Sequence, residues 1–201
     1  MFYETATNQH GLPHDPFKAI VSPRPIGWIG TKAADGSLNL APYSFFNAIS
    51  DRPKLVMFSS SGRKDSVRNI EETGCFTANF VSHDLLQQMN TSSAPFDHGV
   101  SEFERAGLTP VTGRLVAAPY VAEAMAVLEC QVTEIMVPKD ISGGESENIA
   151  VFGQVLGIHI AERALRDGRF DVTLAQPVSR LGYMDYATVT EVFELRRPQA
   201  K

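Results

Sequence analysis

The fold of this chain is decided by a stretch that reads IGWIGTKAADGSLNLAPYSFFN, residues 26–47. Apolar and polar residues alternate on both sides of a central Asp35-Gly36 pair. That pair is a strong signal for a tight turn between two antiparallel strands. We therefore expect one strand in residues 26–32 and a second in residues 38–47, joined as a hairpin.

Further alternating segments extend this β pattern, with only short helical segments between them. Long alternating strands with hairpin connections favour an antiparallel barrel. No GxGxxG fingerprint of a Rossmann domain follows the first strand. We therefore expect a mainly β fold with a few short helices. The other expected strands are residues 54–59, 75–81, 109–117, 126–137, 148–160 and 188–195, and the expected helices are residues 65–73, 83–89, 101–107 and 161–167.

Length and composition indicate a single globular domain that spans residues 1–201. The chain is 43% hydrophobic and 20% charged, its formal net charge is −5, and it contains no internal repeat. Its N-terminus lacks the pattern of a secretory signal, and no apolar segment is long enough to cross a bilayer. We therefore expect a cytoplasmic protein without a membrane partner. Cys75 and Cys130 do not form a CxxC pair and are expected in the core.

A second informative stretch reads SSSGRKDSVRNI, residues 59–70, and follows a short apolar run. A strand, a small polar loop and a helix start point free N–H groups and hydroxyls at one place. The helix dipole and the cations Arg63 and Lys64 make that place electropositive. A cationic pocket on an acidic chain favours a small phosphorylated ligand over nucleic acid. Asp65 is expected to cap the helix through its side chain.

The chain also carries a series of motifs in order: PRPIGWIGT (23–31), DGSLNLAPYSFFN (35–47), KDSVRNI (64–70), TGCF (73–76), EF (102–103), AGLT (106–109), LEC (128–130) and RLGY (180–183). Together they resemble the flavin reductase-like family of FMN-binding split β-barrels, which includes flavoredoxin-type proteins. The resemblance implies a Greek-key split antiparallel barrel and a homodimer with FMN near the subunit interface. It also implies redox chemistry at the flavin, often with NADH or NADPH as hydride donor. The last motif departs from the family, where a second glycine often stands at the position of Tyr183.

The resemblance further implies which residues hold the cofactor. Lys64 and Ser66 match the family's Lys-Asp-Thr phosphate motif, with serine in place of threonine. Both hydroxyls donate hydrogen bonds, so this departure costs little. Ser44 and Asn47 are expected to contact the polar edge of the flavin ring, with Phe46 among the aromatic walls.

Two further residues of the first hairpin strand are expected near the flavin. Trp28 either stacks on the ring or lies in the core, and both interpretations stay open. Thr31 is expected to bond the ring or the ribityl chain. Arg24 is rigidly presented between two prolines, and its acidic partner is a phosphate or a carboxylate. The complete set of expected cofactor-binding residues is Trp28, Thr31, Ser44, Phe46, Asn47, Ser59, Ser60, Ser61, Arg63, Lys64, Asp65 and Ser66.

No side-chain set for nucleophilic or metal catalysis is recognisable in the sequence. No Ser/His/Asp group appears, and His10 and His14 lack further ligands nearby. Hydride transfer to a flavin needs two rings in contact rather than a side-chain nucleophile. The leading hypothesis is therefore an NAD(P)H:flavin oxidoreductase whose reduced flavin could serve a partner oxygenase. Two alternatives stay open: an electron carrier with tightly bound FMN that serves another redox protein, and a barrel that binds another phosphorylated small molecule.

Overall fold

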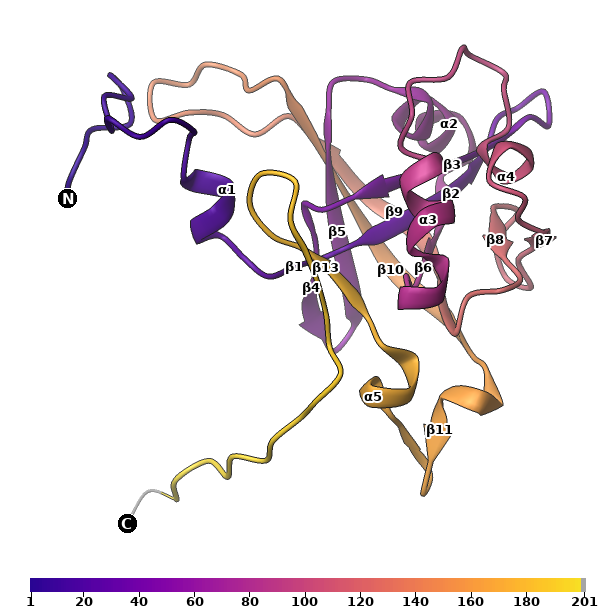
Figure 1. Ribbon diagram of the computed structural model, residues 1–201. Helices are drawn as coiled ribbons and strands as arrows, with labels where there is room; N and C mark the ends of the chain where they lie inside the picture. The colour runs from indigo at the N-terminus through magenta and orange to yellow at the C-terminus, as the bar shows by residue number, and fades with distance from the viewer. Residues whose placement is uncertain (200–201) are drawn as a thin grey trace.

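The computed structural model describes residues 1–199, and its main feature is a curled seven-stranded antiparallel sheet (Figure 1). The strand order is β3-β2-β6-β9-β10-β5-β4, so β5 pairs with β10 and not with the next strand in sequence. This order and curl confirm the predicted split antiparallel barrel of Greek-key type. The strands are β2 (Gly27–Lys32), β3 (Leu38–Tyr43), β4 (Phe46–Asp51), β5 (Lys54–Ser61), β6 (Cys75–Asn79), β9 (Ala126–Met136) and β10 (Asn148–Ile160).

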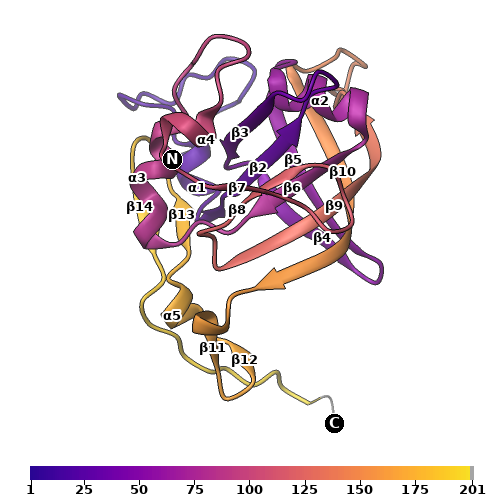
Figure 2. The same ribbon diagram turned by 90° about the vertical axis from the view of Figure 1, so that its right-hand side faces the viewer.

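Smaller elements surround this sheet. A three-stranded sheet and α1 lie together at one side of the large sheet, close to α3 (Figure 2). Its strands are β1 (Arg24–Pro25), β13 (Val178–Arg180) and β14 (Tyr186–Thr188), and two short ladders pair β7 (Pro110–Thr112) with β8 (Pro119–Val121) and β11 (Leu165–Arg166) with β12 (Arg169–Phe170). The α-helices are α1 (Phe17–Ile20), α2 (Asp65–Thr73), α3 (Leu86–Thr91), α4 (Glu102–Arg105) and α5 (Val172–Ala175), and the 3₁₀ turns are η1 (His83–Leu85) and η2 (Glu162–Ala164).

Helix α2 confirms the predicted helix at residues 65–73. It ends because Gly74 adopts a left-handed conformation at φ +69°, which glycine does without strain. Val67 and Ile70 are buried and anchor the helix against β2 and β3. The expected cap is wrong, since Lys64 occupies the N-cap position and no side chain caps the helix.

Three of the predicted strands are wrong in their extent. The second hairpin strand is interrupted at Ser44 and Phe45, where the chain turns from β3 into β4. The strand expected at residues 109–117 shrinks to β7, because the N–H groups of residues 114–116 bond the Glu129 carboxylate instead of a neighbouring strand. The strand expected at residues 188–195 is also missing: only Thr188 belongs to β14, and the residues after it to 199 are in no strand.

The apolar interior consists mainly of two clusters on either side of the large sheet. One gathers Trp28, Leu40 and Phe103 under α3 and α4, and the other gathers Phe58 and Phe76 under α2. All five side chains are fully buried. This packing fixes the strand ends that carry the polar residues of the candidate site. Within residues 1–199 no helix is long and apolar enough to span a membrane.

Candidate cofactor-binding cavity

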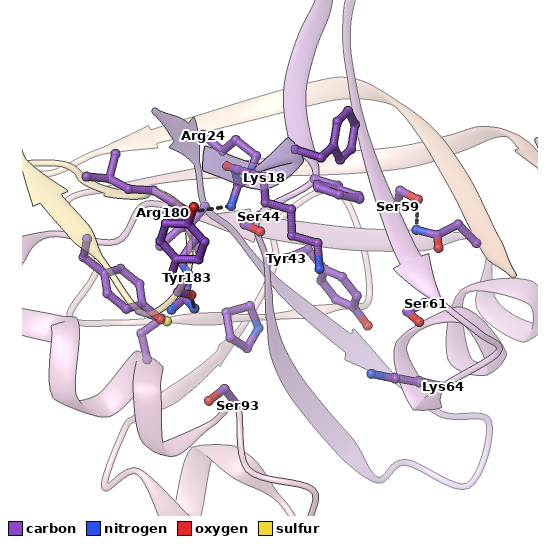
Figure 3. Close-up of a pocket in the computed structure, with 18 residues that line it drawn as sticks. Lys18, Arg24, Tyr43, Ser44, Ser59, Ser61, Lys64, Ser93, Arg180 and Tyr183 are labelled. Carbon is purple, nitrogen blue, oxygen red and sulfur yellow. Dashed lines mark hydrogen bonds between the residues drawn. The ribbon is translucent and has the colours of Figure 1, made fainter. Parts of the chain in front are cut away.

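A cavity of about 620 Å³ opens between the β3–β4 turn, the end of β5, α1 and the small sheet (Figure 3). We call it the main cavity. Its lining combines hydroxyl-bearing, aromatic and cationic side chains, and no Asp or Glu takes part. The lining residues are Phe17, Lys18, Arg24, Ile26, Pro42, Tyr43, Ser44, Phe45, Ser59, Ser61, Lys64, Met89, Ser93, Asn148, Arg180, Leu181, Tyr183 and Tyr186.

One side of the main cavity is built from the end of β5 and the start of α2. Alternation along β5 points Ser59 and Ser61 to the same side, and Asn148 on β10 donates its Nδ2 to Ser59 Oγ at 2.9 Å. Gly62 then turns the chain at φ +79°, which brings Lys64 to the N-cap of α2. The first N–H groups of an uncapped helix lack partners and carry partial positive charge. This side is therefore suited to an anion.

A second cavity, of about 420 Å³, adjoins the main one and shares Pro42, Tyr43, Lys64 and Ser93 with it. Arg63 lines the second cavity, but its Nε donates to Glu71 Oε2 at 2.7 Å. The ion pairs formed within the described chain include none with Lys64. Lys64 is thus the uncompensated cation at the junction of the two cavities.

The Asp65 carboxylate contacts neighbouring side chains of the protein. Its Oδ1 accepts from Arg68 of the same helix and lies 3.1 Å from Nδ1 of His98. The carboxylate therefore neutralises a neighbouring cation at the rim of the second cavity. Its charge does not oppose an anion at Lys64 as strongly as an unpaired carboxylate would.

The opposite side of the main cavity is cationic as well. Arg24 on β1 and Arg180 on β13 lie there, and Lys18 extends from α1 into the cavity with its ammonium group near Tyr43 (Figure 3). Arg24 is only 7% exposed and donates to the carbonyl oxygens of Lys18, Val21 and Leu181. Burial and the nearby Arg180 lower the pKa of Arg24. Arg180 lies over the ring of Tyr186, with its guanidinium carbon 4.4 Å from the ring centroid.

The comparison with protein families agrees with this geometry. A family model described as "Flavin reductase like domain" matches residues 21–185. The chain belongs to the flavin reductase-like family. This membership confirms the resemblance read from the motifs and assigns the chain to flavin-linked oxidoreductases or electron carriers.

Relatives within the family support the assignment along nearly the whole chain. An uncharacterised protein of Aquifex aeolicus is 38% identical over 170 residues, which are 81% of this chain and 83% of the relative. Among solved structures, nitrilotriacetate monooxygenase component B from Bacillus cereus has a TM-score of 0.86 at 30% identity and covers 97% of this chain and 98% of its own. The 2-nitrobenzoate 2-nitroreductase of Pseudomonas fluorescens has a TM-score of 0.85 at 26% identity, with 98% and 96% covered.

The structure gathers six of the twelve expected cofactor-binding residues around the two cavities with side chains that are at least partly accessible. Ser44, Ser59 and Ser61 line the main cavity, Arg63 and Asp65 line the second, and Lys64 lines both. Four others belong to the interior. Ser60 is fully buried and donates to the Gly62 carbonyl at 2.8 Å. Ser66 borders the second cavity but is 1% exposed, and its Oγ accepts from Asn39.

Trp28 and Thr31 are the other two buried residues, which favours the core interpretation of Trp28 and argues against the expected contact of Thr31 with the flavin. Trp28 has no exposed surface, and its Nε1 donates to Ser92 Oγ at 2.9 Å. Thr31 is also fully buried and accepts a hydrogen bond from Asn69 of α2. A flavin cannot stack on a ring that the core encloses on both faces.

Phe46 and Asn47 lie on β4 outside both cavities. The Phe46 ring covers Gly27, where an added Cβ would come within 2.5 Å of it, and lines a separate apolar pocket. Asn47 is exposed, and its Oδ1 accepts from the N–H of Ala48. Phe46 and Asn47 were expected at the flavin but lie elsewhere because the strand is interrupted at Ser44 and Phe45. Ser44 and Phe45 line the cavity, and the chain then turns into β4.

Sequence reasoning missed several cavity residues. Lys18 sits in a four-residue helix without a strong pattern, and Asn148 begins a strand 89 positions after its partner Ser59. Arg24 was recognised as a rigidly held cation, but its partners were not. Tyr183 adopts φ +54°, a left-handed conformation that explains why a glycine often stands here in the family.

Proposed function

We propose that this protein binds FMN in the main cavity and transfers hydride from NADH or NADPH to it. The observation that carries the proposal is the uncapped N-terminus of α2 beside Lys64, Ser59 and Ser61. A phosphate monoester is a fitting occupant of such a place, because it accepts hydrogen bonds from N–H and hydroxyl groups and pairs with a lysine. FMN carries one such group, whereas the residues here form no second, pyrophosphate-binding glycine loop.

The remaining lining suits the flavin ring. Tyr43, Phe45 and the Ser44 hydroxyl line the same cavity, and the Phe45 ring centroid lies 5.9 Å from the guanidinium carbon of Arg24. Aromatic walls with few polar groups are the usual surroundings of a planar ligand. Bound FMN supplies the electron acceptor for a hydride. The task of this chain is then to bind and orient the two reactants and to exclude water, with no side chain acting as nucleophile.

A homodimer belongs to the proposal. The large sheet leaves apolar side chains exposed on β4 and β10, where Ile49 and Ile158 are 46% and 50% exposed along one shallow apolar groove. Exposed apolar patches of this kind mark association surfaces. An oxygenase that takes up reduced flavin is the partner we propose, since the similar Bacillus cereus protein is a monooxygenase component by name. Sedimentation at micromolar concentration tests the dimer.

Anaerobic mixing of FMN-loaded protein with NADH or NADPH tests the proposed reaction. We expect the flavin absorbance to bleach with either or both nucleotides. The rate should vary little between about pH 6 and 8, because no general acid or base is required. If dithionite bleaches the flavin but neither nucleotide does so within minutes, the protein is an electron carrier. If purified protein takes up no FMN, the FMN assignment is refuted, and the alternative of a barrel that binds another phosphorylated small molecule is tested next.

A further inference from the structure

We propose that Lys18, Arg24 and Arg180 form a second anion subsite of the main cavity, which binds the phosphate or carboxylate group of the molecule that exchanges electrons with the flavin. The inference rests on the proposed function, because it assigns the Lys64 side of the cavity to FMN. It adds the chemical class of the second reactant: an anionic molecule with an aromatic ring.

The first argument is charge. Four cations line the main cavity and no acidic residue lines it, although the chain as a whole carries a net charge of −5. None of the ion pairs within residues 1–199 involves Lys18, Arg24 or Arg180. One phosphate at Lys64 leaves these three charges without an acidic partner in the cavity lining. Unscreened positive charge around a cavity attracts anionic ligands and raises their rate of association.

The second argument is burial. Arg24 is only 7% exposed, and its Nε has no hydrogen-bond partner within the described chain. A guanidinium in this position has lost much of its hydration, and its contacts are carbonyl oxygens and the ring of Phe45, none of which carries a net negative charge. Buried charges are normally paired with an opposite charge. An anion in the cavity would supply that pairing.

The third argument is the pairing register of the small sheet. Arg24 on β1 lies directly opposite Arg180 on β13, and like charges at opposed positions destabilise a sheet. The burial and the repulsion both act to lower the pKa of Arg24. A fold that places two arginines together without an acid is suited to a ligand carboxylate or phosphate, which two guanidinium groups bind well.

The surroundings of the subsite indicate the rest of the ligand. Phe17, Tyr183 and Tyr186 border the same side of the cavity, so an aromatic ring attached to the anion would find apolar and stacking contacts. Two sources share this chemistry: a nicotinamide dinucleotide, with its phosphates, and an aromatic carboxylate. The experiment separates them by using one probe of each kind.

Binding of NADP⁺ and of benzoate to FMN-loaded protein is measured by calorimetry and by the change in the flavin spectrum. We expect at least one probe to bind wild type and to bind Lys18→Gln/Arg180→Gln at least tenfold more weakly. The charge-retaining Lys18→Arg/Arg180→Lys variant should lose less affinity than the neutral variant, because it keeps both charges but replaces the planar guanidinium of Arg180 with an ammonium group. The control Arg52→Gln/Lys139→Gln removes two cations that line neither cavity and should bind as wild type does.

Three outcomes would refute the proposed subsite. No binding of either probe to wild type, equal loss in the control, or no loss in the Lys18/Arg180 neutral variant each refutes the subsite. FMN affinity is measured on the same proteins, so that a loss of flavin is distinguished from a loss of probe binding, and circular dichroism reports correct folding. Failure of wild type to bind FMN refutes the proposed function instead, and the two probes are then titrated into the flavin-free protein to judge the subsite alone.

Discussion

Arg24 and Arg180 face each other across the β1–β13 ladder, in direct register. The two differ in what holds them. Arg24 is buried and ties α1 to the small sheet through the carbonyl oxygens of Lys18, Val21 and Leu181, whereas Arg180 is partly exposed and lies over Tyr186. Arg24 therefore positions the N-terminal segment against the cavity, in addition to carrying charge.

This difference predicts unequal effects of one conservative change. Arg24→Lys retains the charge, but a compact ammonium cannot reach three carbonyls set for a planar fork. We expect the free energy of unfolding to fall by about 1.5–3 kcal/mol, the range for hydrogen bonds of charged groups. Arg180→Lys should cost less than about 1 kcal/mol. Urea unfolding measures both, and faster hydrogen exchange in residues 17–20 should accompany only the first; equal costs would contradict the clamp.

Lys64 is the cation on which FMN affinity should depend. Lys64→Ala removes one charge-assisted contact, so we expect the FMN dissociation constant to rise on the order of ten- to a hundredfold. Riboflavin lacks the phosphate and should bind the variant and wild type equally. Lys54→Ala is the matched control, since Lys54 forms an ion pair with Asp51 far along β5. Fluorescence titration of the flavin decides the matter, and unchanged FMN affinity in folded Lys64→Ala would refute the phosphate assignment.

The sequence predicted well whatever depended on local pattern. The Asp35-Gly36 turn, α2 at residues 65–73 and β10 at residues 148–160 are all found where alternation and capping signals placed them. The strand predicted at residues 188–195 is wrong, since only Thr188 belongs to a strand. A strand needs a partner, and alternation alone does not reveal whether one is present. The small sheet was missed because its strands are two or three residues long and because β1 pairs with β13 between Arg24 and Arg180, 156 positions apart (180 − 24).

Residues of the candidate site were likewise predicted where they are close in sequence and missed where they are distant. Ser59, Ser61 and Lys64 are neighbours in sequence, and a local motif was enough to bring them together. Trp28 was left open between flavin and core, since a strand pattern shows which residues share a face but not which face meets a ligand. Lys18 and Arg180 come from opposite ends of the chain, and only tertiary structure brings them to one cavity.

The burial of Trp28 predicts a change in stability without a change in flavin binding. Trp28→Phe removes the hydrogen bond to Ser92 Oγ and leaves a small void in the core. We expect the free energy of unfolding to fall by about 2–3 kcal/mol. FMN affinity should stay within about twofold of wild type. Paired urea unfolding and flavin titration test this, and a large loss of affinity in a stable variant would place the indole at the flavin after all.

Glu129 predicts how stability depends on pH. Its burial opposes ionisation, but His159 and the N–H groups of Arg114, Leu115 and Val116 outweigh it and hold the pKa at about 2. Because the folded pKa lies below the ordinary value of 4.5, the ionised carboxylate stabilises the fold above about pH 4.5. That stabilisation is lost as the pH falls towards 2.

The full effect corresponds to about 3 kcal/mol at neutral pH. We expect Glu129→Gln to be destabilised by roughly that amount at pH 6, and by about half as much at pH 3. Glu134→Gln, on the same strand, is the control and should show no such convergence. Unfolding at the two pH values measures the difference, and a constant gap between Glu129→Gln and wild type would show that the carboxylate charge contributes nothing.

Tyr183 predicts an effect of a single Cβ atom at the cavity. Its φ of +54° is left-handed, and the preceding Gly182 leaves room for Ala19 of α1, which an added Cβ would approach within 2.3 Å. Tyr183→Ala and Tyr183→Gly remove the same ring, but only glycine relieves the backbone strain. We therefore expect the glycine variant to be more stable than the alanine variant by about 1 kcal/mol. Thermal or urea unfolding of the pair tests this, and an alanine variant as stable as the glycine variant would show that the turn is not left-handed in solution.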